Sequence, residues 1–269
     1  MPKLHVNGVQ LHYEEYGSGN ETIVFAHGYL MSHKMFAAQI NALKDRYRII
    51  AYDHRCHGES EVVKTPFGMY DLVDDGAALI DKLVGGPVHF MGMSTGGYVG
   101  VRLMVNRPEL LKSVVLMDTS AESESAESLK QYNLLLTVVR YLGVRPVFSK
   151  AIAILMGEKF RTDPARKTEY QMWRRYIMGL NKTGLYQFGR AIFDRDSVHE
   201  HMSSIDIPTL MVVGDKDIPT PPEKARRLAN TLPNAQLVLV PDAGHTAPTE
   251  EPAFVNAAIE KFLANLAER

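Results

Sequence analysis

One serine in this sequence has neighbours whose types and spacing could do chemistry. Ser94 lies within Gly-Met-Ser-Thr-Gly-Gly, residues 92–97, between an apolar run at residues 88–91 and a helical segment at residues 95–106. A strand, a tight turn and a helix in this order can expose a serine hydroxyl and direct free backbone N–H groups at a neighbouring oxyanion. We interpret Ser94 as a nucleophile; the alternative is a glycine-rich turn of a doubly wound sheet.

A serine nucleophile needs a base to take its proton, so a histidine must reach Ser94 from elsewhere in the chain. We choose His245, in a turn at residues 242–246 that follows the apolar run at residues 236–240, because a loop at a sheet edge can lean over the serine turn. The other histidines considered, each favoured as surface or structural, are His5, His12, His54, His57, His199 and His201. The pair His199 and His201 has no third ligand at a recognisable spacing, which disfavours zinc there.

The base in turn needs an acid that holds it in the correct tautomer. Residues 214–217, Gly-Asp-Lys-Asp, follow an apolar run and so place two carboxylates at the carboxyl end of a strand, where the sites of open α/β folds collect. We predict Asp217 as the acid and expect Asp215 to bond within its own turn. Asp118, after the run at residues 113–117, is the runner-up.

An oxyanion site would complete this chemistry. Residues 25–29, Phe-Ala-His-Gly-Tyr, end another apolar run. The backbone N–H of Tyr29 can therefore join that of Thr95 in binding a tetrahedral oxygen. By itself this segment would be interpreted only as a turn at a strand end; beside Ser94, Asp217 and His245 it predicts an oxyanion hole.

Short apolar runs alternate with helix-length segments along most of the chain, as in a parallel sheet whose strands are buried on both faces. The runs lie at residues 22–26, 48–52, 88–91, 113–117, 209–213 and 236–240, and the helical segments at residues 34–44, 70–84, 95–106, 222–232 and 252–266. Asn7-Gly8, between two alternating stretches, predicts a hairpin near the start. We predict an α/β fold with a mostly parallel central sheet and helices on both faces.

One long segment interrupts the alternation. Residues 121–194 contain apolar positions at helical spacing and no strand-like run, and they begin with a polar, linker-like stretch. We predict a helical cap, or lid, over residues 121–194 and a core made of residues 1–120 and 195–269. The apolar face of the cap is expected to shape a pocket, with Met172 and Trp173 as its candidate lining residues.

Composition narrows the class of partner. The chain has 269 residues, 45% hydrophobic and 23% charged, with a formal net charge of −1. This composition favours a globular core and provides no basic field for nucleic acid or anionic membrane. The single cysteine, Cys56, cannot form an internal disulfide, and the opening residues lack the apolar core of a secretion signal. We expect a soluble cytoplasmic protein that acts on a small molecule; a homodimer stays open.

Five blocks in order resemble the α/β-hydrolase superfamily over essentially the whole chain. They are His27-Gly28, residues 53–60, residues 92–97, residues 214–217 with Pro219, and Gly244-His245 with Glu251-Pro252. The resemblance implies the α/β-hydrolase fold. This chain has Cys56 where the family more often has glycine, which suggests a local backbone difference. It also has Thr95 where the residue after the serine is commonly methionine in the family.

Within that superfamily the chain is similar to 3-oxoadipate enol-lactonases, small carboxylesterases and acyl-homoserine lactonases. Met93 and Thr246 differ from the asparagine and tryptophan usual in carbon–carbon bond hydrolases, and Ser94 replaces the aspartate nucleophile of haloalkane dehalogenases and epoxide hydrolases. The resemblance implies a serine hydrolase of carboxylic esters or lactones with small to medium acyl groups, acting through an acyl-enzyme without metal or organic cofactor. The alternatives are a cofactor-free perhydrolase or haloperoxidase, and a ligand-binding member without turnover.

Overall fold

The central feature of the molecule is one twisted sheet. The computed structural model describes residues 2–268, in which eight strands have the order β1-β2-β4-β3-β5-β6-β7-β8. Strand β2 is antiparallel to β1 and β4, and all other neighbouring strands are parallel. The strands are β1 (Lys3–Val6), β2 (Val9–Tyr16), β3 (Thr22–Ala26), β4 (Arg48–Tyr52), β5 (Val88–Met93), β6 (Leu111–Met117), β7 (Thr209–Gly214) and β8 (Ala235–Val240). The predicted mostly parallel sheet is confirmed.

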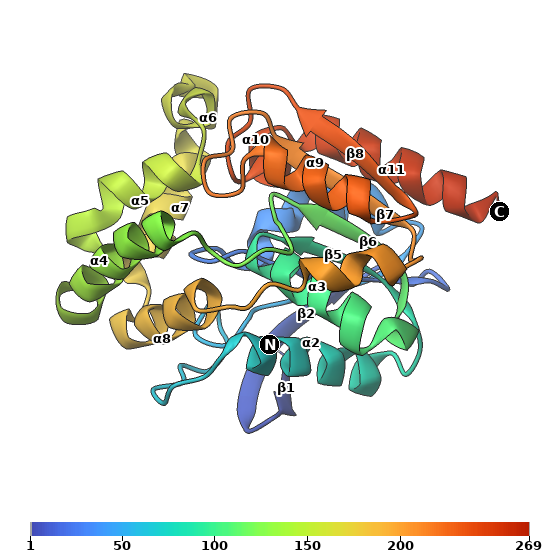
Figure 1. Cartoon of the computed structure of the whole chain (residues 1–269), viewed down its shortest axis with the longest axis horizontal. Coiled ribbons are helices and arrows are strands. Elements are labelled where there is room, and N and C mark those ends of the chain that lie inside the picture. The colour runs from blue at the N-terminus through green and yellow to red at the C-terminus, as the bar shows by residue number, and fades with distance from the viewer. Residues whose placement is uncertain (1, 269) are drawn as a thin grey trace.

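Helices cover both faces of the sheet, as predicted (Figure 1). One face packs against α2 (Met69–Leu83), α3 (Thr95–Asn106) and α9 (Pro222–Thr231), and the other against α1 (Ala37–Leu43) and α11 (Pro252–Ala267). Alternate side chains of β3 enter the two cores: Val24 and Ala26 face the first, and Ile23 and Phe25 face the second. Burial on both faces is why these strands appear in the sequence as continuous apolar runs.

The segment between β6 and β7 is helical. Its helices are α4 (Ala126–Leu142), α5 (Phe148–Leu155), α6 (Glu158–Thr162), α7 (Lys167–Gly179) and α8 (Lys182–Phe193), joined by the short 3-10 turns η3 (Arg145–Val147) and η4 (Pro164–Arg166). In Figure 1 α4, α5, α7 and α8 gather at one end of the molecule, away from the C-terminus. That residues 121–194 act as a separate cap stays a prediction. Within residues 2–268 there is no helix with the length and apolar character needed to cross a bilayer.

Short connections complete the fold. They include η1 (His33–Phe36) before α1, η2 (Pro108–Leu110) before β6, η5 (His199–Ser204) before β7, and α10 (Ala247–Glu250) before α11. The predicted hairpin turn has Asn7 at a φ of 43° and Gly8 at a φ of 75°. Both values lie in the left-handed region that a two-residue hairpin turn of this type requires.

The backbone at Cys56 corrects one expectation. We expected cysteine in place of glycine to mark a backbone difference, yet Cys56 has a φ of 68°, in the region that glycine favours. Its N–H donates to the Glu61 carbonyl at 2.9 Å, and its buried Sγ accepts from the Val63 N–H at 3.3 Å. Local hydrogen bonds therefore hold a left-handed turn at this residue without a glycine.

Two glycines allow the turn between β5 and α3 to close. A Cβ on Gly96 would lie 1.9 Å from the carbonyl oxygen of Ala26 at the end of β3, and a Cβ on Gly92 would lie 2.2 Å from the Gly96 carbonyl oxygen. Neither contact can be relieved by moving a flexible side chain, because the opposing atoms belong to the backbone. The glycines of residues 92–97 therefore set the distance between α3 and the sheet.

Replacing Gly96 with alanine tests this close approach. We expect Gly96→Ala to lower the free energy of unfolding by about 3 kcal/mol or more, because overpacking against backbone forces the helix and strand apart. The control is Gly179→Ala, where an added Cβ meets no atom within 4 Å, and here the change should stay below about 1 kcal/mol. Urea unfolding followed by circular dichroism measures both. Equal stability of the two variants would contradict the assignment.

Candidate active site

Ser94 lies in a strained turn between β5 and α3. Its φ of 49° and ψ of −107° are unfavourable for a residue with a side chain, and they are held by tertiary hydrogen bonds. The Ser94 N–H donates to the Met117 carbonyl at 2.8 Å, and the Ser94 carbonyl accepts from the Thr119 hydroxyl at 2.9 Å. The side chain stands at the carboxyl edge of the sheet, and the residue is 7% exposed.

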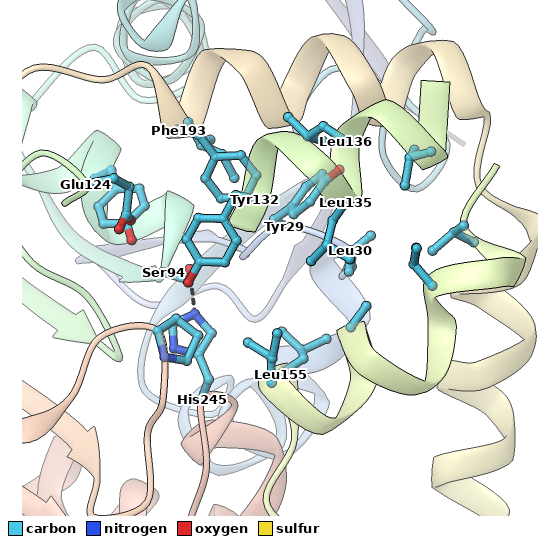
Figure 2. Close-up of a pocket in the computed structure, with 18 residues that line it drawn as sticks. Tyr29, Leu30, Ser94, Glu124, Tyr132, Leu135, Leu136, Leu155, Phe193 and His245 are labelled. Carbon is cyan, nitrogen blue, oxygen red and sulfur yellow. Dashed lines mark hydrogen bonds between the residues drawn. The ribbon is translucent and has the colours of Figure 1, made fainter. Parts of the chain in front are cut away.

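The structure brings Ser94, His245 and Asp217 into one hydrogen-bonded line. His245 Nε2 lies 2.9 Å from Ser94 Oγ, as Figure 2 shows, and His245 Nδ1 lies 2.9 Å from each carboxylate oxygen of Asp217. The three residues follow β5, β8 and β7 respectively. Because Nδ1 faces a carboxylate it carries the proton, so Nε2 is left as the acceptor for the serine hydroxyl. This arrangement can activate a serine for attack on a carbonyl carbon.

Thr220, which was not among the predicted site residues, positions the acid. Its N–H donates to Asp217 Oδ1 at 3.0 Å, and its hydroxyl donates to Asp217 Oδ2 at 2.8 Å. These bonds fix the plane of the carboxylate that faces His245. A threonine three residues after an aspartate is too common in turns to predict this role from sequence.

The charge of Asp217 controls the proton affinity of His245. Burial disfavours the imidazolium form and by itself would lower the pKa of His245. The effect of the Asp217 carboxylate opposite Nδ1 is larger, so the pKa of His245 is raised above its ordinary value. A base with a raised pKa accepts the serine proton more readily. It is also neutral, and therefore active, only at pH values above that raised pKa.

Asp118, the runner-up acid, bonds to backbone groups. Its Oδ1 accepts from the Gly214 N–H and its Oδ2 from the Ala247 N–H, both at 2.9 Å. Burial, with the nearby charge of Asp217 adding to it, raises the pKa of Asp118 well above its usual range. Asp118 thus joins the end of β7 to the start of α10, on either side of the loops that carry Asp217 and His245.

A second buried carboxylate, Glu250, holds the loop that carries His245, and it too was not among the predicted site residues. Glu250 accepts from the N–H groups of Gly244 at 2.8 Å, Thr246 at 3.1 Å and Gly157 at 3.0 Å, and from the Thr246 hydroxyl at 2.8 Å. Gly244 and Thr246 flank His245, so Glu250 holds the loop on both sides of the base. A buried glutamate cannot be told from an exposed one by its place in the sequence.

The predicted oxyanion donors are free. Within residues 2–268 neither the Tyr29 N–H nor the Thr95 N–H has a hydrogen-bond acceptor. Two histidine rings hold the loop that carries Tyr29. The Leu30 N–H donates to His57 Nε2 at 3.2 Å, and His27 Nδ1 donates to the Gly28 carbonyl at 2.7 Å. Burial lowers the pKa of His27 to about 4 and that of His57 to about 3, so both rings support the loop in the neutral form.

The remaining histidines lie away from Ser94. His199 Nε2 bonds to the Thr231 hydroxyl at 3.2 Å, and the side chain of His201 is 56% exposed. His54 is buried against His27 and Tyr52, and His5 is exposed on β1. His12 belongs to a separate cluster described below.

A mostly apolar cavity of about 840 Å³, counting its open mouth, lies above Ser94 and His245 (Figure 2). Three helices of the segment between β6 and β7 supply most of its walls: Tyr132, Leu135, Leu136 and Val139 from α4, Ala151, Ile154 and Leu155 from α5, and Ile192 and Phe193 from α8. The predicted lining residues lie elsewhere. Met172 is 40% exposed, and Trp173, 2% exposed, packs in the core beside Tyr176.

One charged side chain interrupts the apolar wall. Glu124 lines the cavity and pairs through Oε1 with Arg195 Nη2 at 2.9 Å, whereas its buried Oε2 accepts no hydrogen bond within residues 2–268. Lys224 Nζ lies 4.0 Å from Oε2. A buried carboxylate oxygen without a donor can accept one from a ligand.

Comparison with known proteins agrees with this fold. The family profile described as alpha/beta hydrolase fold matches residues 21–252, and the chain belongs to this family. A thermophilic esterase from Thermogutta terrifontis superposes with a TM-score of 0.91 at 28% identity, covering 99% of both chains. The enol-lactonase of Burkholderia xenovorans LB400 gives a TM-score of 0.91 at 27% identity, covering 98% of this chain and 100% of the other. The 3-oxoadipate enol-lactonase 2 of Acinetobacter baylyi is 26% identical over 98% of each chain. Within this family the chain is thus similar to an esterase and to two enol-lactonases.

Replacing each aspartate with asparagine distinguishes the role of Asp217 from that of Asp118. We expect Asp217→Asn to lower kcat/KM on the order of 10³- to 10⁴-fold, because an amide no longer holds His245 in the active tautomer. Asp118→Asn should lower the free energy of unfolding by about 1–3 kcal/mol, since an amide cannot accept both backbone N–H groups, while turnover per folded molecule changes less than tenfold. Ester hydrolysis and thermal unfolding measure the two effects. The reverse pattern would make Asp118 the acid.

Proposed function

We propose that this chain is a serine hydrolase that cleaves carboxylic esters or lactones with small to medium acyl groups. The observation that carries the proposal is the hydrogen-bonded line from Ser94 Oγ through His245 to Asp217, set at the floor of the apolar cavity. The membership of the family and the likeness to an esterase and an enol-lactonase support the same reaction class.

In this proposal Ser94 Oγ attacks the carbonyl carbon while its proton passes to His245 Nε2. Asp217 stabilises the imidazolium that forms, and the N–H groups of Tyr29 and Thr95 bind the oxyanion. His245 then gives the proton to the leaving alkoxide, which departs as the alcohol or, in a lactone, stays attached to the acyl group. Water attacks the acyl-enzyme with His245 again as base, releasing the acid and Ser94. No step requires a metal or an organic cofactor.

The cap segment, residues 121–194, is assigned the acyl pocket. The apolar side chains of α4 and α5 face the cavity, which would exclude water around the scissile bond. The few charged groups of the cavity favour an uncharged acyl chain. These features support a substrate of modest length and low charge, whether it is an open ester or a lactone.

Removing the nucleophile tests the reaction. We expect Ser94→Ala to abolish hydrolysis of aryl esters, because no other group supplies the attacking oxygen. Turnover should fall at least on the order of 10³-fold, with wild-type circular dichroism and thermal unfolding as the control for folding. Initial rates with esters from acetate to dodecanoate, together with enol-lactones and acyl-homoserine lactones, then define the acyl preference. Persistence of wild-type rates in Ser94→Ala would overturn the proposal.

The same assay separates the alternative activities. A perhydrolase or haloperoxidase would form more peracid or halogenated product in the presence of peroxide than it hydrolyses ester. A ligand-binding member would bind members of the panel, visible by calorimetry, with no product. Either outcome would replace the hydrolase assignment while leaving the fold unchanged.

Glu124 predicts a preference within the substrate class. We expect esters that carry a hydroxyl or amide N–H able to reach Glu124 Oε2 to be favoured over isosteres without that donor by about tenfold or more in kcat/KM, because a hydrogen bond to a charged acceptor is strong. Glu124→Ala should remove this preference. The matched control is Glu122→Ala, a neighbour whose carboxylate pairs with Arg227 on the surface and should leave it intact. Equal preference in both variants would assign Glu124 a structural role only.

A further inference from the structure

A buried polar cluster lies beside the loop that carries Tyr29, and the proposed hydrolysis does not use it. His12 and Glu14 come from β2, His33 begins η1, and Asp53 follows β4. One ring nitrogen of each histidine and one oxygen of Asp53 lie within 4.8 Å of one another. The side chains of His12 and Asp53 are fully buried, that of His33 is 3% exposed and that of Glu14 is 29% exposed.

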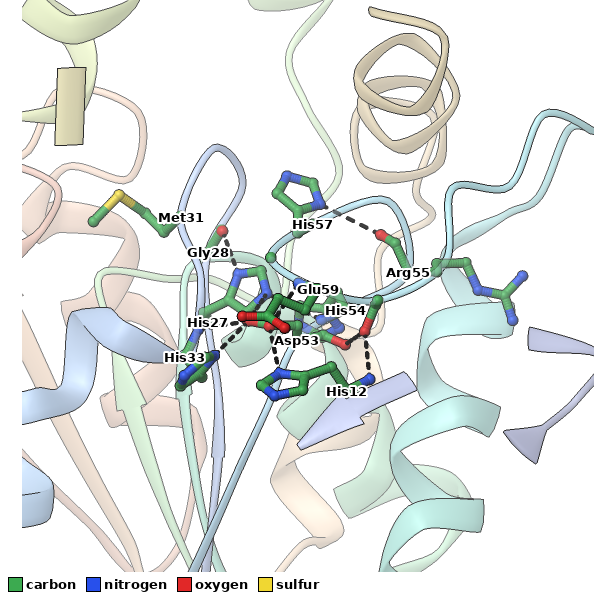
Figure 3. Close-up of polar contacts among 12 residues, drawn as sticks. His12, His27, Gly28, Met31, His33, Asp53, His54, Arg55, His57 and Glu59 are labelled. Carbon is green, nitrogen blue, oxygen red and sulfur yellow. Dashed lines mark hydrogen bonds and ion pairs between the residues drawn. The ribbon is translucent and has the colours of Figure 1, made fainter. Parts of the chain in front are cut away.

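The hydrogen bonds of Asp53 define which ring nitrogens carry protons. Its Oδ2 lies 2.9 Å from His12 Nδ1, and its Oδ1 lies 2.9 Å from His33 Nδ1 (Figure 3). A carboxylate only accepts hydrogen bonds, so both Nδ1 atoms must be donors. Each neutral ring therefore keeps an unprotonated Nε2. Both Nε2 atoms are buried and have no hydrogen-bond partner among the described residues.

A third acceptor faces both of these nitrogens. Glu14 Oε1 lies 3.5 Å from His33 Nε2 and 3.9 Å from His12 Nε2, while Glu14 Oε2 accepts the Tyr16 hydroxyl. When both rings are neutral, two imidazole nitrogens therefore face the same carboxylate oxygen with no donor between them. Such a set of lone pairs needs a donor or a cation among them, which can be an added proton, a water molecule or a metal ion.

The chemical types of the three donors, and their two distances from Glu14 Oε1, suit a metal ion. Zinc binds imidazole nitrogen and carboxylate oxygen at about 2.0–2.2 Å, which puts neighbouring ligand atoms in a tetrahedral site roughly 3.3–3.5 Å apart. The two separations from Glu14 Oε1 need only small side-chain movements to meet this value. Zinc-bound histidines also commonly donate their other ring N–H to a carboxylate, and Asp53 here receives both.

We propose that His12 Nε2, His33 Nε2 and Glu14 bind one divalent transition-metal ion, with zinc the best match to these ligands. The partly exposed side of Glu14 gives the ion and a fourth ligand, water, a path from solvent. The ion would join β2 to η1, close to the loop that carries Tyr29. Its place is structural, because all three ligands lie outside the Ser94, His245 and Asp217 line.

Metal binding to the purified full chain tests this site. Protein treated with a chelator and moved to metal-free buffer is titrated with ZnCl₂ by calorimetry, and the retained metal is counted after gel filtration. We expect one equivalent of zinc and a higher thermal unfolding temperature. Cobalt(II) in place of zinc should give the intense visible absorption of a tetrahedral site. Less than a tenth of an equivalent retained would show that a proton or a water molecule, and no metal ion, bridges the cluster, and it would overturn the proposal.

Variants locate the bound ion. Glu14→Gln and His33→Gln should each weaken zinc binding at least about tenfold. Losing a metal ligand should cost at least as much affinity as losing a residue that only hydrogen-bonds to a ligand. Glu14 is partly exposed, so its variant keeps the test valid if His33→Gln fails to fold. His201→Gln, on an exposed histidine, is the matched control and should bind as wild type. Unchanged zinc affinity in Glu14→Gln and in folded His33→Gln would contradict the site. Zinc binding that is retained in Ser94→Ala would show that the metal site is independent of the proposed hydrolysis.

Discussion

The backbone turn at Ser94 is the constraint on which the candidate site depends. A φ of 49° at a serine costs energy, and it persists because β6 and β3 fix the turn from two sides. Gly96 must pass directly beneath the Ala26 carbonyl for α3 to begin where it does. Once the hydroxyl stands at the carboxyl edge of β5, the loops after β3, β7 and β8 need only short paths to reach it, because parallel strands end at the same edge.

Buried carboxylates do much of the positioning around this turn. Asp118, Glu250 and Asp53 each accept hydrogen bonds from backbone N–H groups of neighbouring loops, and none of them touches Ser94. Burying a carboxylate carries a large desolvation cost that only several good hydrogen bonds offset. The same requirement makes each carboxylate selective for one loop conformation. The reactive geometry therefore rests on groups that have no part in the proposed bond-making.

The candidate site combines polar groups at the carboxyl edge of the sheet with apolar walls formed by helices. The core of the fold supplies the serine, histidine, aspartate and free N–H groups, whereas α4, α5 and α8 supply the walls above them. Because different elements supply the two parts, the walls can change while the sheet edge stays the same. In this chain the Glu124–Arg195 pair is the main polar exception in those walls.

The sequence by itself predicted the elements and marked Ser94 as the candidate nucleophile. Buried parallel strands appear as unbroken apolar runs, so the predicted run at residues 22–26 coincides with β3, and glycine spacing marked the turn at Ser94. Only the tertiary structure decided between Asp217 and Asp118 as the partner of His245, because both follow parallel strands and differ only in where their carboxylates point. It also decided which cap residues face the cavity, since helical periodicity shows which residues share a face and not what that face meets. The cluster of His12, His33 and Asp53 could not be foreseen, because its members are brought together solely by packing of segments distant in the chain.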